Sequence, residues 1–200
     1  ESLAALDPMP YAVAFLDDDD ILYPLMSEVA LDALRVSGAD VVTFSSNQRV
    51  PWSPAQPAYG IGPTLQLLVG NFIPINAYVT RAASVFEAGL RFDESLEYLE
   101  DWDFLIGLIE HRFRFHAVPD VLSEFRMTGD GNAATKRWPE VWKACADRVF
   151  GRADRILQSL SRTEMLTYFG AIAADAINQR TTPEALRELR DKLSRIGDLP

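Results

Sequence analysis

The sequence predicts an α/β fold in which helices flank a mixed β-sheet, followed by an all-helical C-terminal appendage. Residues 11–16 form a short apolar run that is typical of a buried strand. Apolar residues recur at helical spacing over residues 25–36, and a second buried strand is predicted at residues 40–45. This strand–helix–strand order is the signature of an α/β sheet, and we expect the two strands to be neighbours in it.

The predicted domain continues with less regular elements. Pro24 suits the first turn of the helix at 25–36, and Gly38 suits its C-terminal end. A loop rich in proline and glycine is expected at residues 47–63, and loops of this length are often functional. The elements expected beyond it are a short helix (64–69), a strand (75–80), a short helix (82–88), an amphipathic helix (99–112), and two strands (113–118 and 121–127) linked by Pro119 and Asp120.

The C-terminal third of the chain has a different pattern. Residues 137–197 carry three helical patterns and no strand pattern. We therefore expect one α/β domain over residues 1–133 and a helical appendage over residues 134–200. The charged faces of that appendage are expected to be solvated surface.

Composition excludes several classes of protein. The chain has 200 residues, of which 48% are hydrophobic, enough to bury a core. Its formal net charge of −10 disfavours nucleic acid and anionic membrane surfaces as partners. The single cysteine, Cys145, excludes an intrachain disulfide and a cysteine-rich zinc site. No apolar run approaches the ~18 residues of a membrane span. We therefore expect a cytoplasmic protein, either free or bound at the inner face of the membrane.

Four consecutive aspartates, Asp17 to Asp20, follow the first predicted strand. Like charges this close raise one another's pKa unless a cation is present. In an extended segment alternate side chains share a side, so Asp17 and Asp19 would point together. Two carboxylates on one side suit a hard divalent ion such as Mg²⁺ or Mn²⁺, and ligands of open α/β sheets bind beyond the carboxyl ends of the strands. A solvated acidic turn that caps the next helix is the simpler alternative.

A second acidic group, Glu100, Asp101 and Asp103, lies in the first turn of the helix predicted at 99–112. Acids are common at this position because they complement the helix dipole, and for this segment alone that structural interpretation is the stronger one. The functional interpretation is that one carboxylate faces a cleft and accepts a proton from an acceptor hydroxyl. Trp102 is expected to anchor the core in either case.

Four segments stand in order along residues 11–128: YAVAFLDDDDILYP, GLRFDESL, EDWD and VPDVLSEFR. In this order and at this separation they resemble the family 2 glycosyltransferases of the GT-A fold. The first is similar to that family's strand ending in a DxD metal motif. The others are similar to its later half, where an ED motif opens a helix and a strand pair ends in an arginine. DxD alone is a weak signal, whereas the four segments together are a specific one.

The resemblance implies an enzyme that transfers a sugar from a nucleotide-sugar donor to an acceptor hydroxyl, with inversion, in glycan or polysaccharide biosynthesis. It implies that Asp17 and Asp19 bind the metal, Mn²⁺ or Mg²⁺, and that they bind the donor together with Arg126. Asp101 would be the catalytic base, with Glu100 beside it. The implied partners are the nucleotide-sugar and a carbohydrate or lipid-linked acceptor. The two histidines, His111 and His116, are expected to be structural.

One feature departs from the family pattern. The family's first strands and base-binding aspartate precede the DxD strand, whereas only ten residues precede Tyr11 here. We therefore expect the N-terminal nucleotide-binding half to be missing: the chain is a fragment of a longer protein, is completed by strands from elsewhere, or is a degenerate relative. We also expect low activity from the chain as given. A sheet cut at this strand would expose an apolar edge, which favours association.

Two other functions compete with this one. A non-catalytic interaction module, derived from a truncated transferase, accounts for the missing half. A metal-dependent phosphohydrolase of the haloacid dehalogenase type accounts for FLDDDDI, and VVTFSS could supply its second motif. That chemistry also needs a lysine, and the three lysines of this chain, Lys136, Lys143 and Lys192, all lie in the predicted appendage. Binding of a nucleotide-sugar by the chain would separate an enzyme from an interaction module.

Overall fold

The computed structural model describes residues 10–50, 54–59, 62, 64–127 and 138–164. The chain divides into two compact units, residues 1–159 and 160–200. Most of the second unit lies outside the described residues, as do the later helical patterns of the predicted appendage. The domain boundary expected at residues 133 and 134 also lies outside them, so it stays a prediction.

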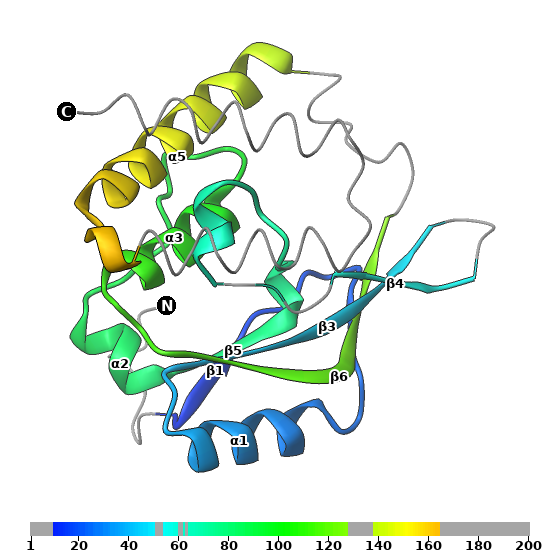
Figure 1. The fold of residues 1–200 in the computed structure, drawn as a ribbon. Helices are drawn as coiled ribbons and strands as arrows, with labels where there is room; N and C mark the ends of the chain where they lie inside the picture. The colour runs from blue at the N-terminus through cyan, green and yellow to red at the C-terminus, as the bar shows by residue number, and fades with distance from the viewer. Residues whose placement is uncertain (1–9, 51–53, 60–61, 63, 128–137, 165–200) are drawn as a thin grey trace. The chain divides into compact units, whose positions relative to one another are not determined.

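A mixed β-sheet forms the centre of the first unit (Figure 1). Its strands are β1 (Ala12–Ala14), β2 (Ile21–Leu22), β3 (Val41–Arg49), β4 (Gln56–Tyr59), β5 (Tyr78–Arg81) and β6 (Phe115–Arg126). The order across the sheet is β1-β5-β3-β6-β2, and β4 pairs with β3. Strands β1, β3 and β6 run in one direction, because β1 and β3 are both antiparallel to β5 and β6 is parallel to β3. The predicted fold class, a mixed sheet flanked by helices, is confirmed.

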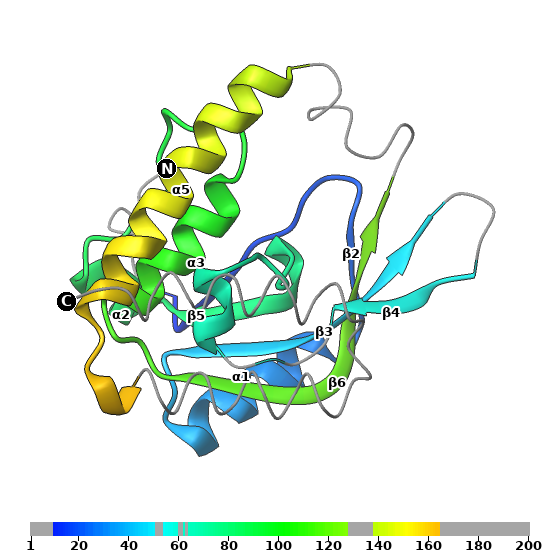
Figure 2. The same ribbon diagram turned by 45° about the horizontal axis from the view of Figure 1, so that its top comes forward.

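Helices cover both faces of this sheet. They are α1 (Met26–Ser37), α2 (Ala82–Glu87), α3 (Glu100–Glu110) and α5 (Pro139–Ser159), with 3₁₀ turns η2 (Thr64–Leu68) and η3 (Ile75–Ala77). Figures 1 and 2 show α1 on one face and α3 with α5 on the other. Helix α1 forms where the sequence predicts it, but its buried face is Met26, Ala30 and Leu34. The predicted stripe of Met26, Val29, Ala33 and Val36 is not that face, because Val36 is 89% exposed. The helix ends at Gly38, whose φ of 65° is left-handed.

The two strands that the sequence predicts as neighbours share the sheet but do not touch. β5 lies between them, because Thr80 pairs with Val13 of β1 on one side and with Val41 of β3 on the other. The prediction of adjacency is therefore wrong. The prediction that the first strand is buried is wrong as well, because β1 is an edge strand of partly exposed residues. An apolar run indicates where a strand lies, but it carries no information on which strands flank it.

The segment predicted as two strands with a turn is one strand, β6. Between two pairs with β3, Thr43–Ala117 and Ser45–Val121, β6 advances four residues while β3 advances two. The two extra residues form an irregularity at Pro119 and Asp120, both exposed. Proline is tolerated in a sheet at such a bulge, so the pair that predicts a turn bends the strand instead.

The helix predicted as amphipathic is buried on almost every side. In α3, residues 102–109 are all buried, because η2 and α5 pack against it as well as the sheet. Trp102 anchors it as expected, donating from Nε1 to the Leu67 carbonyl at 2.7 Å. The prediction that the charged faces of the appendage are solvated surface is wrong for α5, because its Arg152 binds Asp103 and Glu110 of α3.

Two smaller corrections concern the expected loop and strand. β3 runs on to Arg49 and pairs with β4, so the loop expected at 47–63 begins as a pair of strands. The strand expected at 75–80 starts with the 3₁₀ turn η3, and only Tyr78–Arg81 is extended. Within the described residues, no helix combines the length and the apolar character that crossing a membrane requires.

Candidate functional site

The four aspartates follow the carboxyl end of β1 and form a turn. The backbone N–H of Asp20 donates to the Asp17 carbonyl at 3.2 Å. The expected alternation of an extended segment is therefore replaced by a turn, in which Asp17 and Asp18 are exposed and Asp20 is buried. Partial burial raises the pKa of Asp17, and the charges of Asp19 and Asp18 raise it further. Asp17 and Asp19 therefore lie close enough to repel each other, as a metal-binding pair requires.

Asp20 has a different role from its neighbours. Its two carboxylate oxygens accept from Asn76 Nδ2 and from the Arg126 backbone N–H, both at 2.8 Å. Burial nevertheless raises the pKa of Asp20 to about 6, although these partners favour the charged form. Asp20 ties the turn to η3 and to the end of β6. No signal in the run of four identical residues distinguishes it from the others.

Behind this turn, Glu124 of β6 is held by two arginines. Arg49 donates from Nε and Nη2 to the two Glu124 oxygens at 2.7 and 2.8 Å, and Arg126 Nε donates at 3.0 Å. These hydrogen bonds and charges lower the pKa of Glu124 to about 2, although it is only 3% exposed. Arg126, the predicted donor-binding residue, therefore lies near Asp20 and is fixed in place by Glu124.

The predicted base lies in the first turn of α3, beside its predicted neighbour Glu100. Asp101 accepts a hydrogen bond from Asn71 Nδ2 at 3.2 Å. Burial raises the pKa of Asp101 to about 6, and the charges of Glu100 and Asp17 contribute to this increase. Asp17 and Asp101 are 84 positions apart in the sequence (101 − 17), so this electrostatic effect arises from the fold.

An aromatic contact explains how the acidic turn and α3 come together. Phe15, two residues before Asp17, packs against Phe104 of α3 and Tyr78 of β5, with ring centroids 5.6 and 5.8 Å apart. β1 and α3 are thus joined through one ring close to the start of the acidic turn. Packing of this kind positions a site through the core rather than through the acids themselves.

Tyr78 is a feature that the sequence analysis missed. Its side chain is fully buried, and its hydroxyl has no hydrogen-bond partner among the described residues. Burial raises the pKa of Tyr78, and the charges of Asp101 and Asp17 add to this. Phe15, which leads into the acidic turn, packs against its ring. In the sequence, Tyr78 stands in an ordinary apolar strand, which gives no signal of this contact.

The two histidines lie away from the acids. His111 ends α3, where its Nδ1 lies 2.9 Å from the Gly107 carbonyl, and His116 is an exposed residue of β6. Among the described residues, no group of three or more His, Cys, Asp or Glu side chains is arranged to hold a metal ion. A divalent ion at Asp17 and Asp19 would thus need oxygen ligands from a substrate or from water, as Mg²⁺ often has.

The site therefore combines a pair of carboxylates with a separate carboxylate close to them. The pair, Asp17 and Asp19, repel each other and would be stabilised by a cation. The separate one, Asp101, exchanges a proton near neutral pH. Such an arrangement suits a reaction in which a metal stabilises a leaving anion while a base accepts a proton.

Comparison with known proteins gives a structural likeness only. No protein-family profile and no curated protein matches the sequence. Among solved structures, residues 1–349 of S. aureus TarS in complex with UDP-GlcNAc match with a TM-score of 0.50 and 15% identity, covering 76% of this chain and 50% of that one. The same TarS segment without ligand matches with a TM-score of 0.48 and 16% identity, covering 76% and 48%. This chain thus spans about half the length of these structures.

The likeness at a TM-score of 0.50 bears on the fold. It supports a glycosyltransferase-like fold for this chain, built on the mixed sheet and flanking helices described above. An identity of 15% carries no further conclusion about activity.

Proposed function

We propose that the chain belongs to a family 2 glycosyltransferase, which transfers a sugar from a nucleotide-sugar donor to an acceptor hydroxyl with inversion. The observation that carries this proposal is the packing of Phe15 on Phe104 at 5.6 Å, which brings the segment that leads into Asp17 against the helix whose first turn holds Asp101. The resemblance assigns Asp17 and Asp101 to the metal motif and to the base. A structure that separated them would leave the two motifs without a common reaction.

In this proposal Asp17 and Asp19 hold a divalent ion, Mn²⁺ or Mg²⁺. When bound, the metal neutralises the charge that develops on the departing nucleoside diphosphate. Their mutual repulsion supports a cation site, because a bound cation would relieve it. Arg126, held in place by Glu124 beside the same turn, would contact the diphosphate.

Asp101 acts as the general base. It accepts the proton of the acceptor hydroxyl as that oxygen attacks the sugar from the face opposite the diphosphate. A base works best when its pKa lies near the working pH, and a pKa of about 6 meets that condition better than the ordinary aspartate value of 3.8. Glu100 contributes by raising the pKa of Asp101 and would orient the site.

The donor class comes from the structural likeness. S. aureus TarS is seen in complex with UDP-GlcNAc and with UDP. We propose a nucleotide-sugar of this kind for this chain, with a carbohydrate or lipid-linked acceptor in polysaccharide synthesis. UDP and UDP-GlcNAc are accordingly the first ligands to test.

The test measures metal binding directly. Mn²⁺ is titrated into the chain by calorimetry, with and without UDP. Binding should be weak alone and tighter with UDP, because phosphate oxygens complete the metal's coordination. A variant with both Asp17→Asn and Asp19→Asn should lose this binding.

A matched control removes two charges elsewhere. The variant with Asp147→Asn and Asp154→Asn changes two exposed acids of α5 and should bind Mn²⁺ as the wild type does. If the Asp17 and Asp19 variant keeps the wild-type Mn²⁺ titration, the proposed metal site is wrong.

A further inference from the structure

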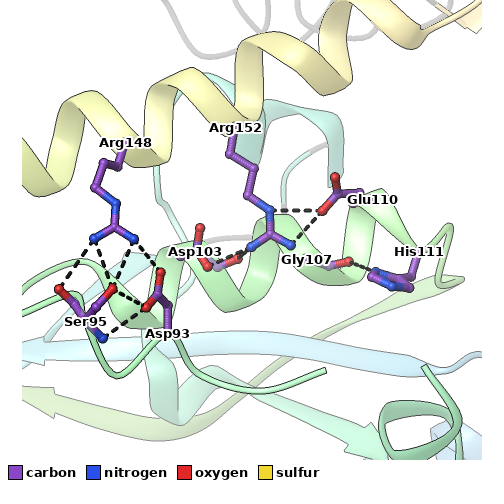
Figure 3. Close-up of polar contacts among 8 residues, drawn as sticks. All are labelled: Asp93, Ser95, Asp103, Gly107, Glu110, His111, Arg148 and Arg152. Carbon is purple, nitrogen blue, oxygen red and sulfur yellow. Dashed lines mark hydrogen bonds and ion pairs between the residues drawn. The ribbon is translucent and has the colours of Figure 1, made fainter. Parts of the chain in front are cut away.

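Arg152 of helix α5 binds the helix that carries Asp101, beside the packing of Phe150 on Trp102. Arg152 Nη1 donates to Asp103 Oδ2 at 2.7 Å and to the Asp103 carbonyl at 3.2 Å (Figure 3). Its Nε and Nη2 donate to Glu110 Oε2 at 3.0 and 2.6 Å. One guanidinium therefore binds the first turn and the last turn of α3 together. The Arg152 side chain is 22% exposed and that of Asp103 12%, so little water screens this ion pair.

The surface of α3 is shaped to admit this guanidinium. Gly107 lies between the two acids that Arg152 binds, and its missing side chain leaves room for the arginine (Figure 3). A Cβ at this position would lie 3.1 Å from Arg152 Nη2 and 3.0 Å from Leu90 Cδ2. A side chain here would require Arg152 or Leu90 to move by a few tenths of an ångström, which would strain the hydrogen bonds of the guanidinium.

The first turn of α3 needs an external support. Leu99, which precedes it, has a φ of 66°, an unfavourable value for a residue with a side chain. It offers no side-chain cap to the helix, and the turn carries three acids: Glu100, Asp101 and Asp103. Arg152 supplies a positive charge and two hydrogen bonds at this point, which offset the repulsion among the acids.

We propose that Arg152 is a positioning residue, which fixes the first turn of α3 and thereby places the Asp101 carboxylate for proton transfer. This inference rests on the proposed function, because it gives Asp101 its catalytic role. Asp103 follows Asp101 by two residues, so a shift of the turn that Arg152 binds would also move the base. An error of about 1 Å in the placement of a catalytic group can cost about 10²-fold in rate.

The test replaces Arg152 and measures both catalysis and local stability. In an enzyme that also supplies the nucleotide-binding half, release of UDP from UDP-GlcNAc is followed in the presence of Mn²⁺. Amide hydrogen exchange is measured at Asp103, whose N–H donates to the Leu99 carbonyl at 2.9 Å. Arg152→Gln should lower kcat by roughly 10- to 100-fold and leave KM for UDP-GlcNAc within about twofold, since donor contacts are unchanged. Exchange of the Asp103 amide should become faster.

Arg148 provides a matched control on the same helix. It binds Asp93 Oδ2 at 2.7 Å and the Ser95 hydroxyl at 3.1 Å, in the loop before α3 rather than in α3 (Figure 3). Arg148→Gln removes an equivalent ion pair of α5 and should leave both kcat and the Asp103 amide near the wild type.

Two further variants separate positioning from general stability. Arg152→Lys keeps the charge and should recover part of kcat. Gly107→Ala keeps every charge but crowds the guanidinium, so it should lower kcat in the same way as Arg152→Gln.

Several outcomes would overturn the inference. The inference is wrong if the Asp103 amide exchanges no faster in Arg152→Gln than in Arg148→Gln. It is also wrong if that amide exchanges faster in Arg152→Gln while kcat stays at the wild-type value. Failure of the proposed function itself is visible separately: Asp101→Asn would then release UDP at the wild-type rate, whatever the result for Arg152.

Discussion

Two carboxylates of this structure, Glu124 of β6 and Asp101 of α3, differ in the charges that surround them. Glu124 is held by Arg49 and Arg126, and its pKa falls to about 2. Asp101 lies among other acids, and its pKa rises to about 6. Burial is the largest cause of the increase at Asp101. At Glu124, which is buried as well, the hydrogen bonds and charges of the arginines outweigh the effect of burial, so the presence of a nearby cation separates the two carboxylates.

The comparison separates a structural acid from a functional one. A carboxylate already neutralised by two guanidinium groups stays charged at any physiological pH and is not available for a reaction. A carboxylate without a cation is costly to keep charged, so it gains from a bound metal or a transferred proton. Strongly perturbed pKa values of this second kind are typical of functional sites.

The largest expected effect comes from Asp101→Asn, which keeps the shape of the side chain but removes its ability to accept a proton. In an enzyme that also supplies the nucleotide-binding half, kcat should fall by roughly 10²–10⁴-fold, the usual contribution of a general base, with donor binding nearly intact. In the wild type, kcat should rise with pH through about 6, because the base must lose its proton first. The measurement is UDP release as a function of pH, with a melting curve of the same protein.

The alternative role of Asp101 predicts a different result. If it only complements the helix dipole, Asp101→Asn lowers the free energy of unfolding by roughly 0.3–1 kcal/mol and leaves turnover unchanged. Normal turnover with a lower melting temperature would therefore remove Asp101 from the catalytic assignment. Glu100→Gln, at the adjacent position, should cost less activity than Asp101→Asn if Glu100 only orients the site.

The second-largest effect is expected at Glu124, the carboxylate that two arginines hold. Glu124→Gln leaves the two arginines without a counter-ion, and we expect the free energy of unfolding at pH 7 to fall by roughly 2–3 kcal/mol. This is below the usual loss for a fully buried pair because Arg49 and Arg126 are 49% and 39% exposed. Activity should respond less to this change than to Asp101→Asn.

The pH dependence of this stability has a defined sign. The folded-state pKa of Glu124 is lowered from its ordinary value of 4.5 to about 2. Its contribution is therefore present above pH 4.5 and is lost as the pH falls toward 2. The difference in stability between wild type and Glu124→Gln should shrink over this range in urea unfolding. A difference that grows on acidification would contradict the assignment.

The smallest effect is expected at Tyr78, a fully buried residue of β5. Tyr78→Phe removes a buried hydroxyl that makes no hydrogen bond among the described residues. Because an unsatisfied buried polar group is unfavourable, the free energy of unfolding should rise by about 1 kcal/mol. Thermal unfolding measures this, and a fall in stability would show that the hydroxyl does have a partner.

The sequence predicts the local elements of this fold well. Apolar spacing locates α1. Gly38 marks its end, because the helix terminates in a left-handed backbone conformation that glycine adopts readily. The acidic turn after β1 and the acids that open α3 are also visible as motifs. Each of these depends on residues that are close in the sequence, so their pattern can be recognised directly.

Long-range arrangement is what the sequence does not reveal. Arg49 and Glu124 are 75 residues apart, and Arg152 and Asp103 are 49 apart, so no local pattern links them. Such pairs form only when strands and helices pack against each other. In the sequence, a charged residue that finds a partner in this way cannot be distinguished from one that does not. β6 illustrates the same limit, since Pro119 and Asp120 favour a turn but the pairing with β3 continues past them.

The acidic turn connects the two edges of the sheet, because β1 stands at one end of the strand order and β2 at the other. In a flat sheet those edges would be roughly 19 Å apart, four spacings of about 4.8 Å. The chain from Ala14 to Ile21, shortened by the turn at residues 17–20, reaches only about 21 Å. Ala14 is also level with Val42 of β3 and Ile21 with Asn47, five residues further along that strand, so the chain could not span a flat sheet. The position of the turn therefore depends on the curvature of the sheet. If Asp17 and Asp19 hold the proposed metal, substitutions in buried strands far from any aspartate should alter its affinity.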